Sequence, residues 1–182
     1  MPHPKLSDSQ INGLIEQVAQ YIEWQRQTYR AKATGIDWNH KTAMKQFFAP
    51  SILESARVNV LKNERVANPP FYPALVQIGF GPALLPDFSL MAAITFVDTI
   101  VSHGPMSMQT LFHELVHAVQ YEKLGLPEFA AKYVYGFLRG GSYEAIPLEQ
   151  NAYQLDERFA RAPQVQFSVE DEVQQWIDSK SF

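Results

Sequence analysis

The chain has 182 residues, 46% of them hydrophobic, and its formal net charge at pH 7 is −4. This length and apolar content are enough for one well-buried core, so we predict a single domain over residues 1–182. The weak net charge, without runs of like charge, argues against binding to nucleic acid or to a membrane surface. The absence of cysteine excludes disulfide frameworks and thiolate metal sites.

The N-terminal region predicts a long helix rather than a targeting segment. The first ten residues lack the apolar core of a secretory signal, and no apolar run approaches a membrane span, so we expect a cytoplasmic protein. Ser7 followed by Gln10 is typical of a capping box, and an apolar stripe begins at Ile11. The pattern predicts an amphipathic helix over about residues 8–32 that packs on the core.

The middle of the chain predicts short strands between proline-rich loops. After a loop with a short helix at residues 35–50, residues 51–55 suit one or two helical turns, and residues 56–61 alternate like a strand. Residues 75–80 predict a second strand, and residues 92–101 are the strongest strand candidate. In that candidate, alternation places four side chains on one face, namely Ile94, Phe96, Asp98 and Ile100.

The stretch from Leu111 to His117 reads Leu-Phe-His-Glu-Leu-Val-His and carries the clearest chemical signal. On a helix, His113 and His117 lie on one face, about 6 Å apart along the axis, where both imidazoles can reach one ion. Glu114 lies about 100° round the helix, outside the ligand set but within reach of an activated water. We predict this helix at about residues 107–124, ending at Gly125.

The motif also has a purely structural interpretation, in which both histidines are satisfied residues of a buried helix. Its three fixed positions coincide by chance in roughly one chain in a hundred of this length, so the motif alone only suggests a metal site. The flanking residues are apolar, and three ionisable side chains on adjacent turns of an apolar helix need a compensating ion. We therefore favour the metal site.

The predicted third ligand comes from a later helix. Residues 127–138 predict a helix, Pro147 starts another that runs to about Arg161, and Ser168 caps a last one over residues 169–178. Of the carboxylates after His117, we favour Glu149, which lies in the first turn beside an apolar stripe. Glu144, in the preceding connection, is the alternative third ligand.

Two motifs together carry a family resemblance. His-Glu-Leu-Val-His, followed by Pro-Leu-Glu-Gln-Asn-Ala-Tyr at residues 147–153, resembles the gluzincin type of zincin metallopeptidases, particularly small bacterial zincin-like domains. The resemblance covers a core of about residues 45–160. It implies an α+β, zincin-like fold, with a small mixed β-sheet packed against the active-site helix and additional N- and C-terminal helices. It also implies that His113, His117 and Glu149 bind one zinc ion, with Glu114 as the catalytic base.

The sequence departs from related patterns at two places. Thermolysin-type gluzincins have an aspartate four residues after the ligand glutamate, where this chain has Tyr153, so the group that orients His113 is unassigned. The metzincin pattern is excluded, because Gln120 and Lys123 replace its glycine and third histidine.

The constellation predicts a zinc-dependent peptidase that hydrolyses a peptide or protein substrate, with Glu114 as general base. Manganese, iron and nickel also suit histidine and carboxylate ligands. The residues that can stabilise an oxyanion are Tyr153, Tyr143, Arg139 and His103. The alternative function is a zincin-fold binding or regulatory module that retains the zinc site with little or no proteolysis. A purely structural zinc site is less favoured, because closed sites lack a base between the ligands.

Overall fold

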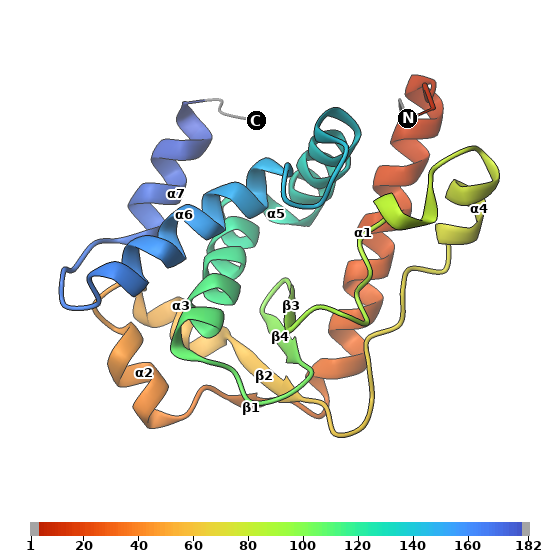
Figure 1. The fold of residues 1–182 in the computed structure, drawn as a ribbon. Coiled ribbons are helices and arrows are strands. Elements are labelled where there is room, and N and C mark those ends of the chain that lie inside the picture. The colour runs from red at the N-terminus through yellow and green to blue at the C-terminus, as the bar shows by residue number, and fades with distance from the viewer. Residues whose placement is uncertain (1–3, 180–182) are drawn as a thin grey trace.

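The structure, a computed structural model, describes residues 4–179. Within these residues the fold is mixed α+β, with seven α-helices and a four-stranded mixed sheet (Figure 1). The elements are α1 (Asp8–Arg30), β1 (Thr34–Gly35), α2 (Trp38–Met44), α3 (Pro50–Ser55), β2 (Arg57–Val60), α4 (Tyr72–Gln77), a 3-10 turn at Pro82–Leu84, β3 (Ala93–Phe96), β4 (Thr99–Ser102), α5 (Met108–Gly140), α6 (Pro147–Arg161) and α7 (Val169–Asp178). The α+β class predicted from the sequence is confirmed.

Local signals set the ends of the first and last helices. Ser7 and Gln10 form the predicted capping box at the start of α1, with both reciprocal hydrogen bonds present. Ser168 caps α7 by accepting a hydrogen bond from the Asp171 backbone N–H. Because a capping side chain acts on residues three positions away, these boundaries can be read from the sequence alone.

The sheet has the strand order β1-β2-β4-β3, in which β2 and β4 are parallel and the outer pairs are antiparallel. Helix α1 packs on one face, where Tyr21 lies against Phe96. Helix α5 packs on the other face, where Phe112 and Leu115 bury Ile100. Because β3 is last in the strand order, it is an edge strand, and it lies beside α5 (Figure 1).

The single strand predicted at residues 92–101 is wrong. The chain turns back at Val97, where φ is 60°, and makes the antiparallel hairpin β3–β4, with Ile94 opposite Val101. Asp98 fixes the turn to α1, because its carboxylate pairs with Arg26 at 2.8 Å and with Arg30 at 2.7 Å. Beyond Phe96, the predicted assignment of alternate side chains to the two faces of one strand is therefore wrong.

The strand predicted at residues 75–80 is also wrong, because Tyr72–Gln77 forms the short helix α4. Pro73 lies in its first turn, where the fixed φ of proline suits a helix and the missing N–H has no cost. Leu75 is the buried residue of α4, whereas Val76 and Ile78 are exposed. A short apolar run does not distinguish a strand from one helical turn.

Helix α5 contains both helices predicted at residues 107–124 and 127–138. Ser107 caps its start by accepting a hydrogen bond from Thr110 N–H at 3.0 Å. Gly125 interrupts it with φ 72° and ψ 161°, and the second half continues to Gly140. Glycine is suited to this position because a positive φ strains residues that carry a Cβ atom. The kink separates a half that carries the histidines from a half that turns toward α1.

Helix α6 lies across α5 at close range (Figure 1). A Cβ atom at Gly136 would lie 2.6 Å from the Cδ atom of Pro147, so glycine permits the start of α6 to approach. Further along, the rings of Phe112 and Phe159 stack with centroids 4.5 Å apart. Ala152, fully buried, lies between these contacts. Packing at two places fixes the position of the first turn of α6, where Glu149 lies.

None of the helices described in residues 4–179 combines the length and apolar character needed to cross a membrane.

Candidate metal centre

Three side chains from two helices converge on one point. His113 and His117 of α5 bring their Nε2 atoms to 3.1 Å from one another. The Oε2 atom of Glu149, from α6, lies 3.4 Å from Nε2 of His113 and 3.3 Å from Nε2 of His117. All three residues are buried, and together they form a cluster that can hold a metal ion.

The opposite nitrogen of each histidine has its own partner. Nδ1 of His113 lies 2.7 Å from Oδ2 of Asp156, and Nδ1 of His117 lies 2.9 Å from Oε1 of Gln120. Both partners are oxygen acceptors, so each Nδ1 carries a proton and donates it. When it is neutral, each imidazole can then present the Nε2 lone pair to the centre of the cluster, as metal coordination requires.

The donor geometry fits a tetrahedral ion. Two atoms that each lie 2.0–2.1 Å from such an ion are about 3.3 Å apart, close to the three separations found here. Oε2 of Glu149 has no hydrogen-bond partner among the described residues, although it is buried. Without a cation or a proton, two lone pairs and a carboxylate oxygen would face one another in a buried space, which is costly. Two histidines and a glutamate suit zinc.

The electrostatics of the cluster favour positive charge. Burial lowers the pKa of His113, but the carboxylates of Asp156 and Glu149 outweigh burial and raise the pKa to about 10. The pKa of His117 is raised as well, because Glu149 outweighs its burial. Conversely, the two histidines hold the pKa of Glu149 well below its usual range despite burial. In the metal-free protein, a proton thus takes the position of a cation.

Glu114 is buried beside the cluster and is not one of its three converging residues. Its Oε2 atom accepts a hydrogen bond from the Thr95 hydroxyl of β3 at 2.7 Å. Burial raises the pKa of Glu114 above its ordinary value, although the two histidines and Thr95 act in the opposite direction. A carboxylate with a raised pKa is a better proton acceptor, and Oε1 remains for that task.

Two of the four residues predicted as oxyanion donors, Tyr153 and Tyr143, lie at the centre. The ring of Tyr153 is 4.6 Å from that of His113, between centroids, and the side chain is partly exposed. Burial, followed by the charge of Glu149, raises the pKa of Tyr143 well above its usual range, so its hydroxyl remains a donor.

The other predicted residues lie elsewhere. Glu144 is exposed and is outside the cluster that contains Glu149. Arg139 is exposed near the end of α5, above the ring of Tyr135. His103 links two loops, because Nε2 accepts from Val66 N–H at 3.0 Å and Nδ1 contacts the Met91 oxygen at 2.5 Å.

Three residues of the centre were missed in the sequence: Asp156, Gln120 and Thr95. Asp156 lies two turns after Glu149 on the same face of α6, and this spacing was a usable signal. Gln120 lies one turn after His117, a spacing that allows contact, but glutamine at that position is not a motif. Nothing local indicates Thr95, because its contact with Glu114 joins a strand to a helix.

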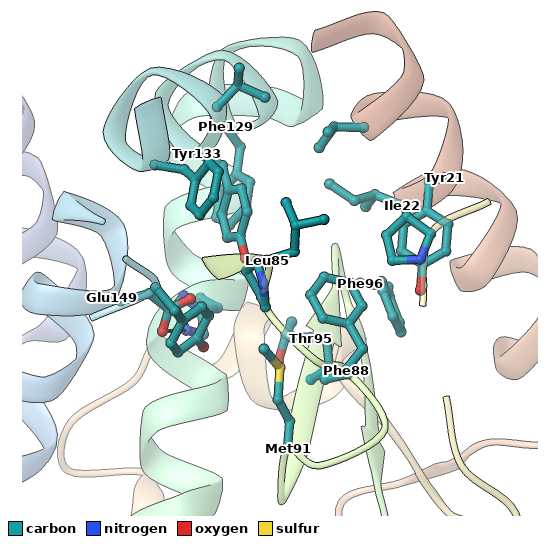
Figure 2. A pocket seen from close by; sticks show the side chains of 18 of the residues that line it. Tyr21, Ile22, Leu85, Phe88, Met91, Thr95, Phe96, Phe129, Tyr133 and Glu149 are labelled. Carbon is teal, nitrogen blue, oxygen red and sulfur yellow. Dashed lines mark ion pairs between the residues drawn. The ribbon is translucent and has the colours of Figure 1, made fainter. Parts of the chain in front are cut away.

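Two cavities meet at the centre. One is the more polar of the two, and it lies on the His113 side between Gln109, Thr110 and Asp156. The other is apolar and lies on the His117 side, between α1 and the second half of α5 (Figure 2). Residues that line both cavities are Met91, Ala93, Glu114 and Tyr143. The candidate base therefore lies where the two cavities join.

Comparisons with protein-family models, with curated proteins and with solved structures find no significant match for this chain.

Proposed function

We propose that this protein is a zincin-like metallopeptidase in which His113, His117 and Glu149 hold one zinc ion. The observation that carries the proposal is the convergence of two Nε2 atoms and one unpartnered carboxylate oxygen at the separations a tetrahedral ion requires. A buried glutamate beside these ligands is what a hydrolytic site needs in addition. When bound, zinc polarises a carbonyl and lowers the pKa of water to about 7.

Glu114 performs the proton transfers. Its carboxylate accepts a proton from a water molecule as the water oxygen forms a bond to the scissile carbonyl carbon. It then gives this proton to the leaving amine as the carbon–nitrogen bond breaks, so it ends each cycle ionised. Thr95 holds Oε2, which orients Oε1 for both transfers. The hydroxyls of Tyr153 and Tyr143 stabilise the negative charge that develops on the carbonyl oxygen.

The free edge of β3 supports a peptide as substrate. His103 N–H donates to the Ala92 oxygen, and pairing with β4 alternates from there, so the backbone groups of Ala93 and Thr95 point away from β4. No other strand within residues 4–179 pairs with this edge. An extended peptide can add to it as a further strand, with its carbonyl carried past Glu114.

The variant Glu114→Gln tests the proposal. We expect it to bind zinc as the natural chain does, because Glu114 is not a ligand, and to hydrolyse peptides at least about a hundredfold more slowly. Elemental analysis gives the metal content, and cleavage of a mixed peptide library gives the rate. Equal cleavage rates for the variant and the natural chain would refute the role of Glu114.

The library result also separates the two functional classes. A natural chain that binds zinc and cleaves no peptide of the library would be a binding or regulatory module with a retained metal site. The two cavities at the centre argue for access by a substrate, since a closed structural site has none.

A further inference from the structure

We propose that the apolar cavity on the His117 side receives one bulky aromatic side chain of the peptide substrate, from the residue next to the cleaved bond. This inference rests on the proposed function and names its specificity. The walls of the cavity come mainly from α1, the segment of residues 69–91, β3 and α5, with Tyr143 and Glu149 added from the chain after α5.

The walls of the cavity are mostly apolar. Figure 2 shows Phe129 and Tyr133 of α5 on one side and Tyr21 and Ile22 of α1 on the other, with Phe96 of β3 between them. The rings pack on one another: Tyr121 stacks on Phe129 at 3.6 Å, and Tyr21 lies 5.8 Å from Phe88, between centroids. Aromatic rings in such a lining contact a further ring in edge-to-face or offset geometry.

The cavity leads to the reacting groups. Glu114, His117 and Glu149 are among the residues that line it, and Figure 2 shows Glu149 on the side opposite Tyr21 and Ile22 of α1. A side chain that fills the apolar part therefore belongs to a residue whose backbone lies at the metal centre.

The two cavities give the site a polarity along β3. A strand added at Ala93 and Thr95 passes from the polar cavity beside Asp156 to the apolar cavity beside Tyr121. We infer a substrate with one large apolar residue on a single side of the scissile bond and no such requirement on the other. An acyl chain would fit the apolar walls, but it offers no groups to pair with the free backbone of β3.

Binding to the zinc-loaded Glu114→Gln protein tests this inference without turnover. The probes are blocked octapeptides of glycine and serine with one variable residue, either phenylalanine, leucine, alanine or aspartate, and their binding is measured by calorimetry. We expect the phenylalanine peptide to bind about tenfold or more tightly than the alanine peptide, because burial of an aromatic side chain is worth at least that factor.

The added substitution Leu85→Trp localises the effect. Leu85 lines the cavity, and a tryptophan there fills the space that the substrate ring would occupy. We expect the preference for phenylalanine to disappear while binding of the alanine peptide and of zinc is retained. Leu90→Trp, at an exposed position five residues later, is the matched control and should leave the preference intact. Val18→Trp, from α1, repeats the test from the opposite wall if Leu85→Trp does not fold.

Three outcomes would overturn the inference: equal binding of the phenylalanine and alanine peptides, a preference that survives both Leu85→Trp and Val18→Trp, or binding of decanoate more tightly than of any peptide. A retained preference without cleavage by the natural chain would refute the peptidase and leave the pocket standing. With cleavage, a phenylalanine moved along the peptide should move the cut with it, at a constant offset.

Discussion

His113 and His117 present the same nitrogen to the centre, yet Nδ1 of His113 meets the carboxylate of Asp156 and Nδ1 of His117 meets the amide of Gln120. The surroundings of the two histidines also differ, because those of His113 are more polar than those of His117. The His113 side opens on a polar cavity, whereas the His117 side borders an apolar cavity and buried rings such as Phe129.

The difference shows how each environment limits the partner that can orient a ligand. Asp156 is buried, but its carboxylate accepts hydrogen bonds from two side chains, His113 at 2.7 Å and Gln109 at 2.9 Å. In apolar surroundings a second carboxylate would lose its hydration without a matching counter-charge, so a neutral amide orients His117 at lower cost. The charge needed by a divalent ion is then supplied by Glu149, which the two sides share.

Removal of the shared ligand should abolish the centre on both sides. We expect Glu149→Ala to lower the metal content from about one zinc ion per chain to almost none, because two histidines alone make an incomplete site. Elemental analysis after dialysis measures it. Glu144→Ala, which removes an exposed carboxylate of the preceding connection, is the control and should retain the metal. Loss of zinc in the Glu144 variant alone would reverse the assignment of the third ligand.

Removal of the charge on the His113 side should weaken metal binding strongly. Asp156→Asn keeps the shape of the side chain but makes a weaker acceptor for the Nδ1 proton, so Nε2 of His113 becomes a poorer donor. We expect about 10–100-fold weaker zinc binding, measured by competition with a chelator of known affinity. Unchanged affinity would mean that the carboxylate contributes only to packing.

The pH dependence of zinc binding should come mainly from the His113 side. The pKa of His113 in the metal-free protein is raised to about 10, so at pH 7.5 zinc must displace a proton. Affinity should therefore fall by about tenfold for each pH unit below 7.5 for one proton displaced, and more if His117 contributes. In Asp156→Asn the pKa of His113 is raised less, so the pH above which zinc affinity stops rising should move to a lower value. Chelator competition at several pH values up to about 10 measures this plateau, and the same plateau pH in both proteins would contradict the assignment.

The parts of this centre that follow local rules were predictable, and the parts that join distant segments were not. His113, Glu114 and His117 share one helix, and the cap at Ser107 and the break at Gly125 bound it, so spacing alone placed them. Asp156 obeys the same helical spacing relative to Glu149, but the family pattern directed attention to Tyr153.

The sheet and the apolar cavity depend on contacts between segments far apart in the chain. The β3–β4 turn at Val97 is held by Asp98, whose partner Arg26 lies 72 residues earlier, so alternation within residues 92–101 could not indicate the reversal. The cavity combines α1, the segment of residues 69–91 and the second half of α5, and none of these segments by itself indicates a cavity. A cavity has no sequence signature of its own when its walls are separate elements.

Gln120, on the His117 side, should affect stability more than metal affinity. Its side chain is fully buried and serves three partners: Nδ1 of His117 at 2.9 Å, the Leu148 oxygen at 3.0 Å and the Asn151 side chain at 2.9 Å. Gln120→Ala leaves these groups unpaired at the contact between α5 and α6. We expect the metal-free protein to lose about 1–3 kcal/mol of unfolding free energy, measured with urea. Zinc affinity should fall by about tenfold at most, because the lost partner is neutral.

Gln109→Ala, on the same helix but exposed, is the matched control. It removes only the hydrogen bond to Asp156 and should cost less than about 1 kcal/mol of unfolding free energy. Equal losses in the two variants would mean that the apolar side does not depend on this buried amide, and the contrast between the two histidines would then lie in charge alone.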